Sequence, residues 1–262
     1  MRDDPLSRIT VVIPTLDRPT ELARCLASLK AQTEVSHEVI LITKRGPLAQ
    51  LRNEGLRQTH TPVVSFIDDD VVCPPGWLAG VLRAMAPPTV VGVTGPAGIP
   101  QAFWDHRDLF KYTHLRRLHD CLFVDARSPG VISRAGTFNT LAAEEGCLYE
   151  GRVDYLEACN MSFKTETLNA VGGFDEAYGG IGDWSEPDVC YRLRVRYGND
   201  CLWFSPTARL EHQPSCRGAY LLRDADARQR LANYRLFSRR WVAPTLRNRL
   251  YHLFLWSYYS TR

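Results

Sequence analysis

Several marks of specialised protein classes are absent from this chain of 262 residues. No run of apolar residues approaches the ~18–20 that a helix needs to span a bilayer. The eight cysteines include no C-x-x-C pair, which argues against a zinc knuckle or a thioredoxin-like site. The first apolar run is broken at Pro14 and is too short for a secretory leader. We therefore expect a cytoplasmic protein with reduced thiols.

Internal repeats and low-complexity segments are lacking as well. The content of 45% hydrophobic and 23% charged residues excludes a disordered or collagen-like chain. A chain of this length favours one large domain, with or without an appendage, and it is long enough to bury a sizeable core.

Lysine is absent from residues 217–262, yet this segment is strongly basic. It contains ten arginines and two acidic residues, for a net charge of +8, whereas residues 1–216 carry a net charge of −5. The formal charge of +3 for the whole chain hides this division. The sequence therefore predicts an acidic body that carries a basic tail.

Segments typical of buried strands alternate with helix-like segments at the start of the chain. Short β-branched runs suit strands of a parallel sheet, and leucines recur between them at helical spacing. The predicted strands lie at 9–14, 38–42 and 62–67, and the predicted helices at 20–29 and 47–58. This order predicts a doubly wound α/β half, in which ligands bind outside the carboxyl ends of the strands.

The later part of the chain continues with further strands and helices. We expect strands at 89–93, near 154–163, at 201–204 and at 208–211, a turn at Gly172-Gly173 and a helix from about Pro187 to Tyr197. From residue 217 onward the pattern is helical and rich in arginine.

Three consecutive carboxylates, Asp68, Asp69 and Asp70, end the third predicted strand. Because side chains alternate along a strand, Asp68 and Asp70 can face one side while Asp69 points away. Two convergent carboxylates form a hard oxygen site that suits Mg²⁺ or Mn²⁺. The alternative is a solvated acidic turn, but the position at the ligand-binding edge of the sheet favours a metal site.

A second group of acidic residues lies at 182–188, just before a predicted helix. Ser185 and Asp188 have the spacing of a capping box, which gives both a structural role. That role does not account for Glu186. A carboxylate beside Trp184 can be held in a partly dry place, where it is ready to act as a general base.

His212 follows the last predicted strand. A lone histidine is more often an ordinary surface or core residue than a ligand. If the strand returns His212 to Asp68 and Asp70, its neutral imidazole suits Mn²⁺ as a further ligand.

The chain carries, in order, the segments VVIPTLDRPTELARCLASLKAQT, FIDDDVVCPPGWL, DYLEACNMSF, VGGFDEAYGG and SEPDVCYRLR, and then His212. This ordered set, over about residues 9–215, resembles the family 2 glycosyltransferases, which have the GT-A fold. The resemblance implies a Rossmann-like, doubly wound mixed sheet with a C-terminal helical tail. It also implies inverting transfer of a sugar from a nucleotide-diphosphate donor to a hydroxyl acceptor, as in cell-envelope polysaccharide, glycolipid or glycan synthesis. The implied cofactor is a divalent cation, Mn²⁺ or Mg²⁺.

The resemblance also implies roles for single residues. Asp68 and Asp70 match the D-x-D element, and together with His212 they are the expected metal ligands. Glu186 matches the base that takes the acceptor proton, and Arg52-Asn53 matches an R-N element near the nucleotide. The expected contacts of the nucleotide sugar are Pro14, Thr15, Asp17, Arg18, Thr43, Arg52, Asp68 and Asp69. The expected acceptor side comprises Asn160, Asp183 and Trp184, together with Trp104, His106, Tyr112, Tyr149 and Glu157 from the region 101–160.

The loop after the second predicted strand departs from the family pattern. Relatives that bind uridine nucleotides commonly have an acidic loop here, whereas this chain has Thr43-Lys44-Arg45-Gly46. A carboxylate that reads the base is thus replaced by two positive charges, which either contact phosphates or stay solvated. The nucleotide base is left open.

We expect a GT-A domain at 1–216, with a nucleotide-binding half at 1–100 and an acceptor-binding half at 101–216, and a basic helical extension at 217–262. In the extension, apolar residues share one helical face: Leu246, Leu250, Leu253 and Phe254. Such a basic amphipathic helix lies on an anionic membrane surface, here the inner face of the membrane, or packs on the domain or on a second subunit. No nucleic-acid recognition motif accompanies the arginines.

Two other classes of protein compete with the transferase. A nucleotidyltransferase would need a glycine-rich loop after the first strand, and residues 15–19 contain no glycine. A non-catalytic sugar- or partner-binding protein on the same fold would not need its acidic residues, yet Asp68, Asp70 and Glu186 are all present.

Overall fold

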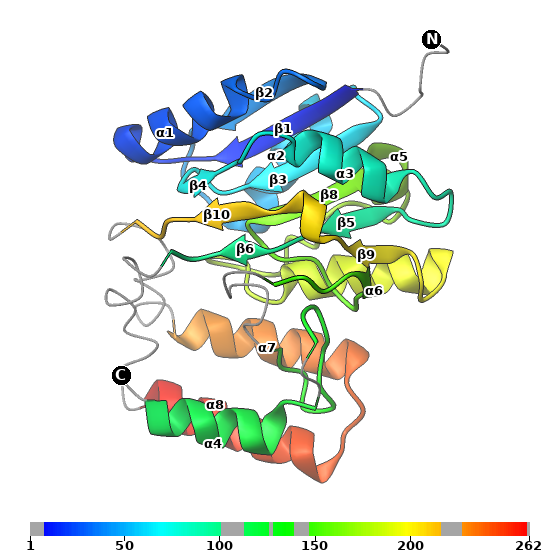
Figure 1. The fold of residues 1–262 in the computed structure, drawn as a ribbon. Coiled ribbons are helices and arrows are strands. Elements are labelled where there is room, and N and C mark those ends of the chain that lie inside the picture. The colour runs from blue at the N-terminus through cyan, green and yellow to red at the C-terminus, as the bar shows by residue number, and fades with distance from the viewer. Residues whose placement is uncertain (1–7, 101–112, 126–127, 139–146, 216–226, 261–262) are drawn as a thin grey trace.

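The first part of the chain forms the alternating strands and helices that its hydrophobic pattern predicts (Figure 1). The strands are β1 (Arg8–Pro14), β2 (Ser36–Ile42) and β3 (Val63–Ile67), and the helices between them are α1 (Pro19–Lys30) and α2 (Leu48–Gln58). β1 pairs in parallel with both β2 and β3, which confirms the predicted parallel arrangement. This computed structural model describes residues 8–100, 113–125, 128–138, 147–215 and 227–260.

An antiparallel strand in the middle makes the sheet mixed. β8 (Asn160–Lys164) runs antiparallel to β3 on one side and to β5 (Gly92–Thr94) on the other. Beyond β5 the sheet continues with β9 (Leu202–Phe204) and the short β7 (Gly151–Arg152). The strand expected at 154–163 is shorter than predicted, because Asp154 and Tyr155 donate their amides to the Gly130 carbonyl instead of pairing with a strand. Likewise, the strand expected at 89–93 begins only at Gly92.

Helices cover both faces of this sheet. On one face α1 and α3 (Trp77–Met85) pack against Val11 and Ile13, and on the other α2 and α6 (Ser185–Tyr197) pack around Val12. The short α5 (Thr165–Ala170) joins the second face through Leu168. The alternation of buried side chains along β1 thus separates two apolar layers, as expected of a doubly wound sheet.

A second, smaller sheet forms beside the carboxyl edge of the large one. It consists of β4 (Val71–Val72), β10 (Leu210–His212) and β6 (Ala97–Gly98), with β10 in the middle. A short 3₁₀ turn, η4 (Pro206–Ala208), leads from β9 into β10. Because β10 runs antiparallel to β4, which directly follows Asp70, the end of β10 returns to the aspartates.

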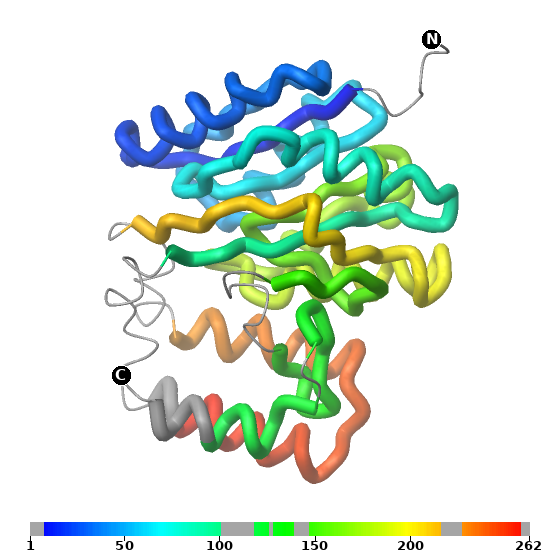
Figure 2. The backbone as a smooth tube through the Cα atoms, viewed as in Figure 1, coloured from blue at the N-terminus to red at the C-terminus, as the bar shows by residue number. Residues whose placement is uncertain are grey.

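The basic extension forms a helical hairpin that packs on the domain (Figure 2). Its helices α7 (Ala227–Trp241) and α8 (Leu246–Ser260) contact each other, and α4 (Thr113–Phe123) lies beside α8 through Phe123 and Tyr251. A shared apolar cluster joins the hairpin to the domain: Phe123, Ala135, Tyr178, Trp184, Tyr234, Phe237, Tyr251 and Leu255. The predicted helical tail is therefore present from residue 227, and residues 216–226 lie outside the described ranges.

Of the apolar face predicted for the tail, Phe254 packs against the shared cluster, whereas the three leucines do not. Leu246, Leu250 and Leu253 are 73%, 48% and 62% exposed, whereas Tyr251 and Leu255 are buried. The reason is that Tyr251 and Leu255 lie on the side of α8 that contacts Tyr234 and Phe123. In the part of the chain that the structure describes, no helix is both long and apolar enough to cross a membrane. Seven cysteines are described and all are free thiols; Cys216 lies outside the described residues.

Candidate active site

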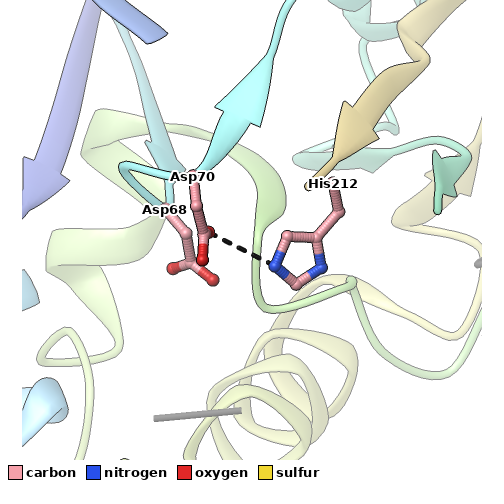
Figure 3. A group of neighbouring side chains, drawn as sticks. All are labelled: Asp68, Asp70 and His212. Atoms are coloured by element: carbon pink, nitrogen blue, oxygen red, sulfur yellow. Dashed lines mark ion pairs between the residues drawn. The ribbon is translucent and has the colours of Figure 1, made fainter. Parts of the chain in front are cut away.

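Asp68, Asp70 and His212 meet at the carboxyl edge of the sheet (Figure 3). The aspartates follow β3, and His212 ends β10 in register with Val71 of β4. One ligand atom from each residue lies within 4.8 Å of the others, and His212 Nε2 is 3.3 Å from Asp70 Oδ1. Two carboxylates and one imidazole form a donor set that suits Mn²⁺. The structure thus brings the three predicted metal ligands together.

Asp69 is directed to the loop after β1 instead. Its Oδ2 accepts a hydrogen bond of 2.5 Å from Thr15 Oγ1, and its Oδ1 lies 2.5 Å from Arg18 Nη2. Arg18 Nη1 also contacts Asp70 Oδ2 at 3.1 Å. Two residues expected at the nucleotide sugar, Thr15 and Arg18, are therefore tied to the aspartates, and the predicted alternation of the three carboxylates is confirmed.

Burial and charge set the ionisation of the three candidate ligands. Burial raises the pKa of Asp68, and the charge of Asp70 raises it further. Burial also acts to raise the pKa of Asp70, but the hydrogen bond and the charge of His212 outweigh it and lower that pKa. Burial opposes protonation of His212, yet its neighbours Cys159 and Asp70 raise its pKa well above the usual value. Because the charge of Asp70 raises the pKa of Asp68, two carboxylates lie close enough to repel each other, and such a pair favours a cation.

The segment after β10 holds Asp70 from the other side, a contact that the sequence reasoning missed. The Ser215 amide donates to Asp70 Oδ2 at 3.0 Å, and the Gln213 amide donates to the Asp70 carbonyl at 2.9 Å. Ser215 Oγ in turn donates to Glu21 Oε1 at 2.5 Å. These contacts join positions far apart in the sequence, and the only sequence signal for Ser215 is its closeness to His212.

Glu186, the predicted base, is buried in the first turn of α6 and forms an ion pair with Arg52 Nη1. Arg52 Nη2 also donates to the Ala158 carbonyl at 3.1 Å. Burial raises the pKa of Glu186, while the charge and hydrogen bond of Arg52 act against this. The structure therefore places Arg52, expected near the nucleotide, in contact with the candidate base. A buried carboxylate with a raised pKa is a stronger proton acceptor than a solvated one.

The capping box predicted for α6 is wrong. Trp184, not Ser185, precedes the helix, and the Ser185 amide donates to the Gly182 carbonyl. Trp184 has a φ of 68°, a left-handed conformation that is uncommon for a residue with a side chain. Asp188 does not cap the helix either, because its carboxylate accepts hydrogen bonds from Tyr178, Arg192, Arg240 and Trp241. The pattern of the sequence could not reveal these partners, which come from other elements.

Helix α7 braces the loop that leads to Glu186. Arg230 Nε lies 2.6 Å from Asp183 Oδ2, and Asn233 both donates to and accepts from the backbone of Gly179. The Trp184 ring packs against Tyr234, with 5.3 Å between ring centroids. Such packing can hold a strained backbone in place. The basic extension is thus part of the structure that positions Glu186.

Glu157 is a further carboxylate on which charges of the site residues act. Its Oε1 accepts a hydrogen bond of 2.9 Å from Tyr155 Oη. Burial raises the pKa of Glu157 to about 7, the hydrogen bond from Tyr155 opposes this, and the charges of Glu186 and His212 also act on it. Glu157 is therefore close enough to both the candidate base and the candidate metal ligands for their charges to act on it.

The remaining residues expected at the nucleotide sugar lie on two neighbouring loops. Pro14 ends β1, and Asp17 and Thr43 are exposed in the loops after β1 and β2. Two ion pairs, both on the surface, involve the basic residues of the second loop: Arg45 with Asp17 at 3.1 Å and Lys44 with Glu54 at 3.2 Å. These loops flank the strand ends that carry Asp68 and Asp70.

The residues expected on the acceptor side have partners within the protein. Asn160 is buried; it accepts from Trp77 Nε1 at 3.2 Å and donates to the Ala208 carbonyl at 2.8 Å. Trp184 Nε1 donates to the Gly136 carbonyl at 3.1 Å. Tyr149 Oη donates to the Arg152 carbonyl. Trp104, His106 and Tyr112 lie outside the described residues.

Comparison with known proteins agrees with this arrangement. Residues 43–134 match the family described as Glycosyl transferase family 2. Two curated relatives, both pre-mycofactocin glycosyltransferases, come from Mycobacterium tuberculosis strains CDC 1551 / Oshkosh and ATCC 25618 / H37Rv. Each is 25% identical over 218 residues, which cover 72% of this chain and 40% of the relative. The chain therefore spans about two fifths of the length of the curated relatives it matches.

Two solved structures share the fold. The mannosyltransferase PcManGT from Pyrobaculum calidifontis, in complex with GDP-Man and Mn²⁺, has a TM-score of 0.57 and 16% identity, covering 98% of this chain and 71% of that one. GalNAc-T7, with UDP, GalNAc and Mn²⁺, has a TM-score of 0.57 and 12% identity, covering 90% and 48%. The mixed sheet and these two neighbours show that the chain has the GT-A fold, and its Asp-Asp-His cluster lies at the carboxyl edge of that sheet. Over residues 43–134 the chain is similar to glycosyl transferase family 2, in agreement with its likeness to the two curated glycosyltransferases.

Proposed function

We propose that this protein transfers a sugar from a nucleotide-diphosphate donor to a hydroxyl group of an acceptor, with inversion at the anomeric carbon. The observation that carries the proposal is the cluster of Asp68, Asp70 and His212, beside a buried carboxylate, Glu186, that is held by Arg52, whose charge also acts on Asp68. In this proposal residues 1–100 bind the donor and residues 101–216 bind the acceptor. Products of the class we expect are polysaccharides, glycolipids or glycans of the cell envelope.

The donor half supplies groups that suit a diphosphate and a divalent cation. Asp68, Asp70 and His212 would hold Mn²⁺ or Mg²⁺, which offsets negative charge on a diphosphate leaving group. Arg18 is already directed to this place, where it lies against Asp69 and Asp70. The complexes of PcManGT with GDP-Man and Mn²⁺ and of GalNAc-T7 with UDP and Mn²⁺ support a donor of this type.

Glu186 would act on the acceptor. Its carboxylate takes the proton of the attacking hydroxyl, whose oxygen forms a bond to the anomeric carbon on the face opposite the diphosphate. The bond between the anomeric carbon and the diphosphate oxygen breaks, and a nucleoside diphosphate leaves. The charge and hydrogen bond of Arg52 favour the ionised carboxylate and fix its position, while burial raises its pKa. Together the two effects provide a base that is charged and still able to accept a proton.

On the acceptor side, Glu157 is the residue best placed to contact a sugar hydroxyl. It is partly accessible, and Tyr155 orients one of its oxygens. Asn160, Asp183 and Trp184 shape this side through the segments they hold, because their polar groups are already bonded within the protein.

The decisive test is calorimetric titration of Asp70→Ala with a nucleoside diphosphate in the presence of Mn²⁺. We expect the Mn²⁺-dependent part of binding to be lost. Asp200→Ala provides a matched control, because the Asp200 side chain is 76% exposed and forms a surface ion pair with Arg152. An unchanged affinity for Asp70→Ala would contradict the proposed site.

The nucleotide is identified by a thermal-shift series with uridine, guanosine, thymidine and cytidine diphosphates plus Mn²⁺. A shift of several degrees with one of them is expected, because a specific ligand stabilises the folded state by mass action. Lys44→Ala and Arg45→Ala then show whether the basic loop contributes to that shift through the phosphates.

A further inference from the structure

The face of the molecule formed by α4 and α8 exposes several large apolar side chains. Leu246, Leu250 and Leu253 follow each other on one side of α8 and are 73%, 48% and 62% exposed. On the neighbouring α4, Leu118 and Leu122 are 48% and 47% exposed. The two helices are in contact, since Arg247 Nε donates to the Leu122 carbonyl at 2.6 Å. We call these five leucines the apolar strip.

A row of arginines runs beside the apolar strip. Arg228, Arg235 and Arg239 are exposed along α7, at positions that share one side of a helix. Arg249 is exposed on α8. Ser238 Oγ of α7, next to Arg239 in the chain, lies 3.2 Å from His252 Nε2 of α8, and burial followed by the charges of Arg235 and Arg239 lowers the pKa of His252. We call these four arginines the basic strip.

The basic strip takes no part in holding the hairpin to the domain. That role belongs to other arginines: Arg230 with Asp183, Arg240 with Asp175 and Asp188, and Arg247 with Asp125. Among the residues that the structure describes, the four arginines of the basic strip form no ion pair with a carboxylate. Neither α7 nor α8 contains an acidic residue. The basic strip is therefore an uncompensated positive surface.

We propose that the apolar and basic strips together bind the surface of a membrane that contains anionic phospholipids. An interfacial surface needs apolar side chains that enter the boundary of the acyl chains and arginines at the level of the headgroups. Each basic residue near an anionic membrane adds about 1 kcal/mol of attraction. The hairpin supplies both kinds of side chain next to each other, on helices that are already folded against the domain.

Charge argues against a second copy of this chain as the occupant. In a twofold dimer the same surface meets itself, so the basic strips of two copies would be brought together. Like charges placed across an interface are unfavourable. An anionic bilayer offers the complementary sign to the arginines and an apolar environment to the leucines.

The hairpin lies where binding to a membrane would bring the candidate base close to the bilayer. It lies at the end of the molecule farthest from α1, and the C-terminal end of α8 is on the same side as the carboxyl end of β10 (Figure 1). Arg230 of α7 contacts Asp183 in the loop before Glu186. A docked hairpin would thus hold the candidate base close to the bilayer, where an acceptor sugar linked to a lipid would be found. This last step rests on the proposed function, whereas membrane docking itself does not.

Sedimentation of the full chain with vesicles tests the docking. Vesicles of phosphatidylcholine with roughly one third phosphatidylglycerol should bind the protein, and pure phosphatidylcholine vesicles should bind it much less. Arg235→Gln with Arg239→Gln should weaken binding by about 10- to 30-fold, and Leu250→Glu with Leu253→Glu by at least as much. Arg24→Gln with Lys30→Gln is the matched control, because both residues are exposed on α1 at the other end of the molecule, and it should bind as the unmodified protein does.

Three outcomes would overturn the proposal: no binding to anionic vesicles, equal binding to neutral ones, or equal loss in the α1 control. Formation of a dimer that Leu253→Glu abolishes would instead assign the surface to a second copy. Circular dichroism and Mn²⁺-dependent nucleotide binding should be unchanged in every variant. These controls separate a failure of docking from a failure of folding or of the proposed function.

Discussion

Arginine is used in opposite ways in two regions of this molecule. In the α/β domain, Arg52 is almost completely buried, with 1% exposure, and its guanidinium contacts the carboxylate of Glu186. In the C-terminal hairpin, Arg228, Arg235 and Arg239 are exposed. A buried arginine fixes the position of one carboxylate and stabilises its negative charge. A row of exposed arginines instead creates a positive potential over part of the protein surface. The difference predicts that substitution of the buried arginine or its partner has a large effect on stability or turnover. Substitution of an exposed arginine should have a small effect on stability.

The largest effect should follow the removal of Arg52. Arg52→Leu leaves Glu186 buried without its partner, which should lower the free energy of unfolding by about 3–5 kcal/mol. Urea denaturation at pH 7 measures this loss. Arg57→Leu on the same helix is the control, because its side chain is 62% exposed and its loss should be small. If both variants lost the same free energy of unfolding, the buried ion pair would contribute no more to stability than an exposed one.

The same pair predicts a rescue. Adding Glu186→Gln to Arg52→Leu removes the unpaired charge, so the double variant should be more stable than Arg52→Leu alone. If the double variant is the less stable of the two, the contact between these side chains does not explain the effect of Arg52.

The next effect concerns turnover. Glu186→Gln should reduce sugar transfer by about 100-fold or more while donor binding persists, because an amide cannot accept the acceptor proton. Initial rates and calorimetry on the same preparation separate the two quantities. Glu166→Gln, another acidic residue in the first turn of a helix, is the matched control and should leave turnover unchanged. Near-normal turnover in Glu186→Gln would assign the base elsewhere.

A smaller effect should appear in the pH dependence of stability. The pKa of Glu157 is raised to about 7 in the folded protein, so the folded state holds this proton more tightly than the unfolded state. The contribution of Glu157 to stability is therefore present below its ordinary pKa of 4.5 and is lost as the pH rises through about 7. Glu157→Gln keeps an acceptor for Tyr155 and removes this loss. At pH 8 without metal, the free energy of unfolding of Glu157→Gln, measured by urea denaturation, should be higher than that of the unmodified protein by about 1–2 kcal/mol.

The smallest effect is expected on the outside. Arg247 forms an ion pair with Asp125, and both side chains are partly exposed, so Arg247→Gln should cost about 1 kcal/mol or less. Arg249→Gln on the same helix should cost less still, because Arg249 is exposed and, like the rest of the basic strip, forms no ion pair with a carboxylate among the described residues. Thermal unfolding of both variants measures the difference. A loss for Arg249→Gln as large as that for Arg52→Leu would remove the contrast between the two regions.

Much of the structure of residues 8–100 could be predicted from the sequence because its signals are local. The apolar run before Asp68 gave a buried strand, and the alternation of Asp68, Asp69 and Asp70 followed from strand geometry. The return of His212 was an expectation conditional on the last strand, and the pairing of β10 with β4 fulfils it.

The contacts that could not be predicted join residues far apart in the chain. The Arg52–Glu186 pair connects α2 with α6, and the Ser215–Glu21 hydrogen bond connects the end of β10 with α1. Ser185 and Asp188 show the limit most clearly. Their spacing fits a capping box, but the tertiary partners of Asp188 outweigh the local preference.

The bracing of Trp184 and Asp183 by α7 has a consequence for how such proteins diverge. The change in composition near residue 216 invites the view that a tail can be removed or exchanged without disturbing the body. Yet Arg230, Asn233 and Tyr234 of α7 hold the loop that carries Glu186. A hairpin taken from a relative would have to bring its own matching loop. The hairpin and the loop before Glu186 therefore form one packed unit, and substitutions in one should be accompanied by compensating substitutions in the other.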